Sequence, residues 1–61
     1  MEFVPERLRD IRIMKGYTVE ELAEKLGVSK QAVSKYEIGK AIPSTDVLTR
    51  LLELFLFLEV I

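Results

Sequence analysis

The stretch "EELAEKLGVSKQAVSKYE", residues 20–37, has a glycine at a point where the helical pattern would otherwise continue. Leu22 and Leu26 recur at the spacing of one helix face, and Gly27 follows them. A glycine at this place favours the left-handed conformation that ends helices, because it has no β-carbon to clash. Ser29 then offers a hydroxyl that caps a new helix. The stretch therefore predicts two short helices joined by a turn of about three residues.

The second of these helices, residues 30–37, carries its long polar side chains on one side. At about 100° per residue, Val33 and Tyr36 fall on an arc that faces a core. The opposite arc holds four hydrogen-bonding residues: Lys30, Gln31, Ser34 and Lys35. Glutamine can contact adenine with two hydrogen bonds, lysine can donate to guanine, and serine adapts to either. An ordinary solvated helix face is the alternative, and the spacing of the whole stretch favours the contact with bases.

A helix also precedes the quoted stretch. Its inner face is expected to carry the apolar residues Val4, Leu8, Ile11 and Met14. Pro5 suits the first turn, where a missing N–H removes no hydrogen bond. We therefore expect a helix that begins at Pro5 and ends at Gly16.

Capping residues mark the starts of two further helices. Thr18 and Glu21, in "TVEE", have the spacing of a capping box, in which each side chain bonds to the backbone N–H of the other residue. Ser44 is placed to cap a last helix, whose apolar positions are Val47, Leu48, Leu51, Leu52, Leu54 and Phe55. The expected fold is all-α, a compact bundle of four to five short helices, with the last six residues as its candidate strand.

Length and composition narrow the range of functions. The chain has 61 residues, which predicts a single domain over residues 1–61 with one small core. It has neither cysteine nor histidine, which excludes thiolate zinc sites and nucleophiles activated by histidine. No acid–base pair or metal cluster is visible, so we expect a protein that is not an enzyme and uses no metal or cofactor. The first residues lack the pattern of a secretory signal, and we expect a cytoplasmic location.

The charge is nearly balanced overall but uneven along the chain. The sequence has nine Lys and Arg residues and ten Asp and Glu residues, and the resulting net charge of −1 is low for a dedicated nucleic-acid binder. Residues 25–40 nevertheless hold four lysines and one acid, Glu37. Positive charge is thus concentrated around the second helix of the quoted stretch.

Together these segments resemble the helix-turn-helix domains of Cro and the lambda-type phage repressors, also called the xenobiotic-response-element family. The resemblance covers roughly residues 5–55 and rests on "RLRDIRIMKGYT", "EELAEKLGVSKQAVSKYEIGK" and "PSTDVLTRLLEL". It implies a lambda-repressor-like domain with a helix-turn-helix unit over about residues 18–38. It also implies that the helix at residues 30–37 enters the major groove of double-stranded DNA.

The resemblance implies roles for single residues as well. Those that would face base edges are Gln31, Lys35, Ser34 and Lys30. Those that would contact phosphates are Ser29, Lys40 and Thr18. Structural roles fall to Gly27 and Ala23 at the turn, and to Arg12 and Glu37, which would tie the first helix to the end of the recognition helix.

Three positions depart from the pattern of the family. Val19 stands where the family commonly has a glutamine that contacts phosphate, and Ile38 replaces a polar residue with the same role. Because phosphate contacts dominate affinity, we expect weaker DNA binding than is usual in the family and a greater dependence on dimerisation. Leu56 stands where the family usually has glycine or asparagine to end the last helix.

The segment "LLELFLFLEVI", residues 51–61, is densely apolar. It is too short and too acidic to span a membrane. One hypothesis is a homodimer interface, because a dense apolar patch invites a partner; it would comprise Phe55, Phe57, Leu58, Val60 and Ile61. The last six residues also have the character of an edge strand that pairs with a second copy. The alternative is that residues 56–61 are the truncated end of a longer protein that lacks its C-terminal domain here.

Two functions stay open at this point. The polar arc favours a transcriptional regulator that binds a palindromic operator as a dimer. The net charge of −1 and the two lost phosphate-binding side chains favour a protein-interaction module, antitoxin-like or a scaffold, with weak or no DNA binding. Salt dependence separates the two, because binding through several phosphates weakens steeply as salt rises.

Overall fold

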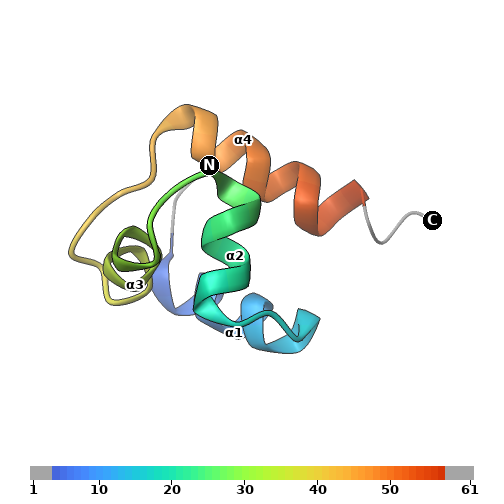
Figure 1. Ribbon diagram of the computed structural model, residues 1–61, viewed down its shortest axis with the longest axis horizontal. Coiled ribbons are helices and arrows are strands. Elements are labelled where there is room, and N and C mark those ends of the chain that lie inside the picture. Colours follow the sequence, from blue (N-terminus) through green and yellow to red (C-terminus); the bar gives the residue numbers. More distant parts are fainter. Residues whose placement is uncertain (1–3, 58–61) are drawn as a thin grey trace.

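The computed structural model describes residues 4–57, which form four α-helices and a final π-helical segment (Figure 1). The elements are α1 (Pro5–Lys15), α2 (Val19–Leu26), α3 (Lys30–Glu37), α4 (Thr45–Leu52) and η1 (Glu53–Phe57). The predicted all-α bundle of short helices is confirmed. No described helix is both long enough and apolar enough to cross a membrane.

Helix α2 occupies the middle of the bundle. In the view of Figure 1, α1 lies below α2, α3 lies to its left, and α4 crosses its upper, C-terminal end. The closest packing is between α2 and α3, while α1 also packs on α3 and α4 packs on α2. Helix α3 therefore lies at one side of the molecule, packed against α2 and α1.

The predicted helix caps are present. The Thr18 Oγ1 accepts a hydrogen bond from the Glu21 N–H at 3.0 Å, and the Glu21 Oε1 accepts one from the Thr18 N–H at 2.8 Å. The Ser44 Oγ accepts from the Val47 N–H at 3.3 Å, and α4 begins at the next residue after Ser44. These local signals fix where α2 and α4 begin, because each one satisfies an N–H that the helix itself leaves without a partner.

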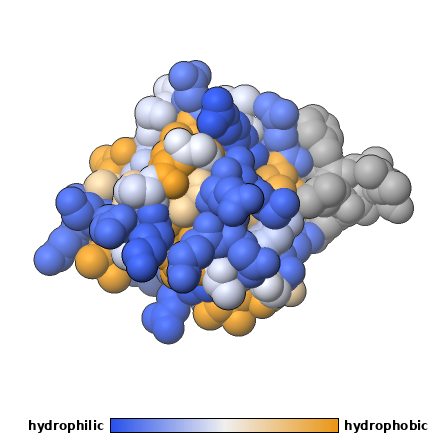
Figure 2. All heavy atoms as spheres, viewed as in Figure 1, coloured by the Kyte–Doolittle hydropathy of each residue, from blue (hydrophilic) through white to orange (hydrophobic). Residues whose placement is uncertain are grey.

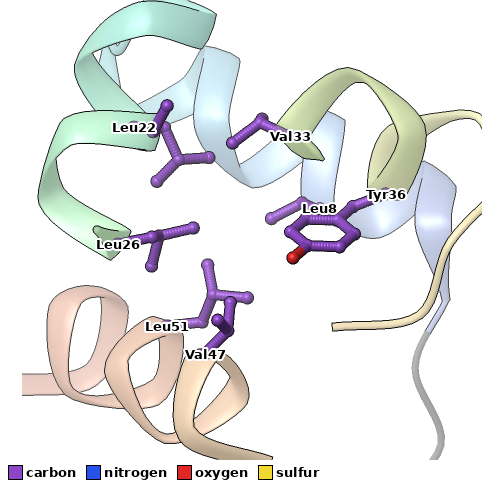
Figure 3. Packing of buried hydrophobic residues seen from close by; sticks show 8 residues of the cluster. Leu8, Leu22, Leu26, Val33, Tyr36, Val47 and Leu51 are labelled. Carbon is purple, nitrogen blue, oxygen red and sulfur yellow. The ribbon is translucent and has the colours of Figure 1, made fainter. Parts of the chain in front are cut away.

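One hydrophobic core joins the four α-helices (Figure 3). Its centre consists of three side chains that are fully buried: Leu22, Leu26 and Val33. The surrounding buried residues are Leu8, Ala23, Tyr36, Val47 and Leu51. Burying each of the central aliphatic side chains contributes roughly 1.5–3 kcal/mol. Since α2 and α3 supply all three, the core is centred on the helix pair predicted from residues 20–37.

The expected inner face of α1 is only partly correct. Leu8 is buried and Ile11 is half-buried, but the Met14 side chain is 83% exposed, and Val4, the residue just before the helix, is 38% exposed. At about 100° per residue, each step of three residues turns 60° backwards, which places Met14 about 120° away from Leu8. Arg12, only about 40° from Leu8, takes the inner position instead.

The suggestion of a strand over the last six residues is wrong for its first two. The chain continues from α4 into η1, so residues 56 and 57 are helical. Leu56 therefore does not end the helix, in keeping with the absence of glycine or asparagine at that position. The rest of the suggested strand, residues 58–61, lies outside the described residues.

Candidate nucleic-acid interface

Helix α3 divides into a buried side and an exposed side. Val33 is fully buried and Tyr36 is 9% exposed. The structure places all four predicted base-reading residues on the exposed side: Lys30, Gln31, Ser34 and Lys35. Ser29 caps the helix, because its Oγ accepts a hydrogen bond from the Ala32 N–H at 3.1 Å. The arrangement presents a row of donors and acceptors on a helix whose other side is anchored in the core.

The turn between α2 and α3 is tight. Gly27 has φ 71°, in the left-handed region, and its N–H and that of Val28 bond to carbonyls in the last turn of α2. Ala23 is only 4% exposed and belongs to the core between the helices. A small residue at this point lets α3 approach α2 closely, and a left-handed glycine redirects the chain within a few residues.

Arg12 and Glu37, which lie 25 residues apart in the sequence, form a partly buried ion pair. The Nε of Arg12 lies 2.6 Å from the Oε2 of Glu37, and its Nη2 donates to the Oε1 at 3.2 Å. The remaining Nη1 donates to the carbonyl oxygen of Tyr17 at 2.9 Å. The two side chains are 13% and 8% exposed, so the pair acts mainly to fix the C-terminal end of α3 against α1.

The predicted phosphate-binding residues lie at three separate places. Thr18 begins α2, Ser29 begins α3, and Lys40 follows α3; all three side chains are exposed. The two hydroxyl oxygens already accept a hydrogen bond from their own helix, but each hydroxyl keeps a hydrogen that it can donate to a phosphate.

Glu21 adds a negative charge beside Thr18. The hydrogen bond from the Thr18 backbone N–H lowers the pKa of Glu21, with a smaller contribution from the Thr18 side chain. The carboxylate is therefore ionised over a wider pH range than usual. It stabilises the start of α2 but repels a phosphate that approaches Thr18.

The two apolar departures from the family pattern have different surroundings. Val19 is half-buried and packs against the core, so it serves the fold of α2. Ile38 is 64% exposed at the end of α3. Ile42, in the loop that follows α3, is 80% exposed. Neither Val19 nor Ile38 can donate a hydrogen bond from its side chain to a phosphate.

Only part of the predicted dimer surface falls within the described side chains. Phe55 is half-buried and packs against the core of its own chain, which leaves only part of its ring for a partner. Leu52, one turn earlier, is 39% exposed. Phe57 is the last residue of η1, and the positions of Leu58, Val60 and Ile61 lie outside the described residues.

One contact near the turn has no signal in the sequence. The Arg50 side chain, from the last turn of α4, donates from Nη1 to the Leu26 carbonyl oxygen at 2.9 Å. The two residues are 24 positions apart, and an arginine near a helix end is ordinarily a solvated charge. The tertiary structure alone brings it to the turn.

Known proteins with similar sequences include transcriptional regulators. A family profile described as helix-turn-helix matches residues 8–55. A predicted HTH-type transcriptional regulatory protein of Pyrococcus furiosus is 52% identical over 50 residues, which cover 82% of this chain and 16% of that protein. An uncharacterized prophage-derived HTH-type transcriptional regulator of Bacillus subtilis is 48% identical over 46 residues, or 75% of this chain and 43% of that protein.

A third relative is an HTH-type transcriptional activator of Enterococcus faecalis, 48% identical over 48 residues that cover 79% of this chain and 23% of the activator. The chain thus spans less than half the length of each of these relatives. No solved structure gives a significant match. The profile match over most of the chain and the identity to these regulators show that the protein belongs to the helix-turn-helix family of the Cro and lambda repressor type.

Proposed function

We propose that this chain is a sequence-specific, DNA-binding transcriptional regulator that places α3 in the major groove of double-stranded DNA. One observation carries the proposal: a hydrogen-bonding row of side chains occupies the exposed side of an eight-residue helix whose other side is buried. The major groove is wide enough for an α-helix, and its base edges offer matching donors and acceptors. The names of the relatives as transcriptional regulators support the regulatory role.

The charges around α3 support the proposal despite the net charge of −1. All four lysines of residues 25–40 are exposed. The single acid in that segment, Glu37, is held by Arg12 at 2.6 Å, so its charge is largely compensated. Lys25 lies 5.6 Å from the centre of the Tyr17 ring, on the α2 side. Three lysines along α3 and its following loop are thus available to attract phosphates.

Within this proposal, Gln31 and Lys35 read base edges, and Ser34 and Lys30 contact bases or phosphates. Phosphate contacts come from the capping hydroxyls of Thr18 and Ser29 and from Lys40. Val19 and Ile38 contribute none, so the affinity of one copy is expected to be low for the family. We also propose a cytoplasmic location, in line with the bacterial and archaeal sources of the relatives named above.

We propose further that two copies bind a palindromic operator as a homodimer. A single α3 reads only a few base pairs, which gives too little specificity to find a site in a genome. Two copies whose recognition helices are about 34 Å apart would enter successive major grooves on one face of the duplex. The exposed part of Leu52 and Phe55, together with the apolar residues that follow, is the surface proposed to join the two copies.

Sedimentation equilibrium tests the dimer. Deleting residues 56–61 is expected to give a monomer that keeps its helical circular dichroism and binds its duplex much more weakly. A full-length chain that stays monomeric at high micromolar concentration, with and without DNA, would contradict the dimer and leave the DNA-binding proposal standing.

A protein-interaction module is the second candidate function. The observation that favours it is the exposure of two isoleucines near the end of α3, 64% for Ile38 and 80% for Ile42. On the face shown in Figure 2, however, hydrophobic residues form separate patches among hydrophilic ones. That face therefore lacks the large continuous apolar surface of a standard protein interface.

The test of the proposed function is a selection from random duplexes followed by a salt titration. A DNA regulator enriches one sequence, and its affinity falls steeply with salt, by a slope of about −0.9 for each phosphate contacted. A protein-interaction module enriches no sequence, and its apolar contacts to a protein hold at high salt. A chain that shows no enrichment and no salt dependence would contradict the proposal.

A further inference from the structure

Arg50 reaches from α4 to the point where the helix-turn-helix turn begins. Its Nη1 donates to the Leu26 carbonyl oxygen at 2.9 Å. The same Nη1 would lie only 2.6 Å from a β-carbon placed on Gly27. The guanidinium group therefore lies directly against the glycine of the turn, in the space that any other residue's side chain would occupy. Figure 1 shows α4 crossing this end of α2.

The contact gives a hydrogen-bond donor to a carbonyl group at the C-terminal end of α2. The last carbonyl groups of an α-helix have no partner within the helix. The N–H groups of the two residues after α2 bond to the carbonyls of Ala23 and Glu24. Arg50 supplies a donor to the carbonyl of Leu26, the final residue of the helix. A cation at this end also interacts favourably with the helix dipole.

We infer that Arg50 is a positioning residue for DNA binding: by fixing the turn, it sets the place of the N-terminal end of α3. The inference rests on the proposed function. Ser29, Lys30 and Gln31 follow Gly27 within four residues, so a shift of the turn moves them before any other part of α3. These are the residues that would meet phosphate and base edges, where small displacements break hydrogen bonds.

The opposite end of α3 is fixed in a comparable way. Arg12 of α1 holds Glu37 at 2.6 Å, in the last turn of the helix. The recognition helix is thus positioned at its two ends by two arginines, one from α1 and one from α4. Neither lies on the exposed arc of α3, so neither needs to touch DNA to affect how α3 meets it.

Substitution of Arg50 tests the inference in the full-length chain. The probes are a duplex selected by the wild type from a random library and a shuffled duplex of the same composition. Arg50→Met keeps much of the apolar stem but removes the donor. It should weaken binding to the selected duplex by up to about fivefold, because the free energy that holds the turn in place cannot exceed that of the single exposed hydrogen bond that is lost. The shuffled duplex should be affected much less, because its binding depends on phosphates.

Two further variants complete the test. Arg50→Lys should restore part of the affinity, because an ammonium group can make a single hydrogen bond to the same carbonyl. Arg9→Met removes the same charge from an exposed position of α1 and should leave the affinity and the selectivity as in the wild type. All affinities are corrected for the folded fraction, measured by circular dichroism under the binding conditions.

Each other outcome overturns the inference in its own way. A salt slope that becomes shallower by about one for Arg50→Met would show that Arg50 contacts a phosphate directly. A lower melting temperature with unchanged corrected affinity would show a role in stability alone. A wild type that selects a sequence while Arg50→Met binds equally well overturns only this inference. A wild type that selects no sequence overturns the proposed function and this inference with it.

Discussion

Replacing Gly27 with alanine should destabilise the domain through two separable effects. The first is conformational: Gly27 has φ 71°, and a β-carbon in this region costs roughly 1–2 kcal/mol. The second is the contact with Arg50, whose Nη1 would lie 2.6 Å from the new β-carbon. The guanidinium is the end of a flexible side chain and can move away. The cost is therefore the loss of its hydrogen bond to the Leu26 carbonyl rather than a rigid clash.

The magnitude of the second effect is about 1 kcal/mol, below the usual range for a charged hydrogen bond because Arg50 is an exposed residue. The total for Gly27→Ala is then about 2–3 kcal/mol. A domain of this length has a free energy of unfolding of roughly 3–9 kcal/mol. The substitution should therefore remove a large part of the stability.

Gly16 provides the matched control. It has φ 79°, and a β-carbon there would meet no heavy atom within 4 Å. Gly16→Ala should show the conformational cost alone, about 1–2 kcal/mol. Urea unfolding followed by circular dichroism measures both variants, and Gly27→Ala should be less stable than Gly16→Ala by about 1 kcal/mol, or about 4–8 °C in melting temperature.

A second background separates the contact with Arg50 from the conformational cost. In an Arg50→Met background, the difference between the two alanine variants should disappear, because the guanidinium is no longer there to be displaced. Equal stability of Gly27→Ala and Gly16→Ala in the wild-type background would show that the Arg50 contact contributes nothing to stability.

Three other perturbations affect the recognition helix, the packing of α2 on α3, and the start of α2. Gln31→Ala and Lys35→Ala should each lower the discrimination between the selected duplex and random DNA by about 1–3 kcal/mol at fixed salt, with an unchanged melting temperature; if both keep the wild-type ratio of affinities, these residues do not read bases. Ala23→Leu should be more harmful than Gly27→Ala in a thermal melt, because Ala23 is 4% exposed and a larger side chain forces α2 and α3 apart; an unchanged midpoint would contradict the close packing. The capping box should make stability depend on pH: the pKa of Glu21 is lowered below its ordinary 4.5, so its contribution is fully present above that value and is lost as the pH falls through the folded-state pKa. Glu21→Gln keeps a capping side chain without a charge and should lose this part of the acid dependence; an identical pH profile for the two proteins would argue against it.

The parts of the fold with local causes could be predicted from the sequence. The bounds of α2 and α3 follow from residues that act on their immediate neighbours: the Thr18–Glu21 capping box, the Ser29 cap and the left-handed Gly27. The exposed arc of α3 follows in the same way, because a short helix with two buried apolar residues has little freedom to rotate.

The features that depend on packing between distant helices could not be predicted so well. Met14 is exposed because two steps of three residues from Leu8 rotate it away from the core face of α1. Its apolar side chain alone suggested an inner position. The continuation of α4 into η1 and the partial burial of Phe55 depend on how the last turns lie on the core. The contact between Arg50 and Leu26 joins residues 24 positions apart and has no periodic signal.

One side chain of the sequence can report directly whether α3 meets base edges through its exposed side. Gln31 is the single glutamine of the sequence, which has no asparagine, so its side chain gives the one pair of side-chain carboxamide resonances in an amide NMR spectrum. We propose to titrate the uniformly labelled chain with the selected duplex and with a shuffled one. We expect large shifts of this pair with the selected duplex, together with the backbone amides of residues 29–35, and small shifts with the shuffled duplex. A carboxamide pair that stays in place on saturation with the selected duplex, while amides elsewhere shift, would contradict contact between α3 and base edges.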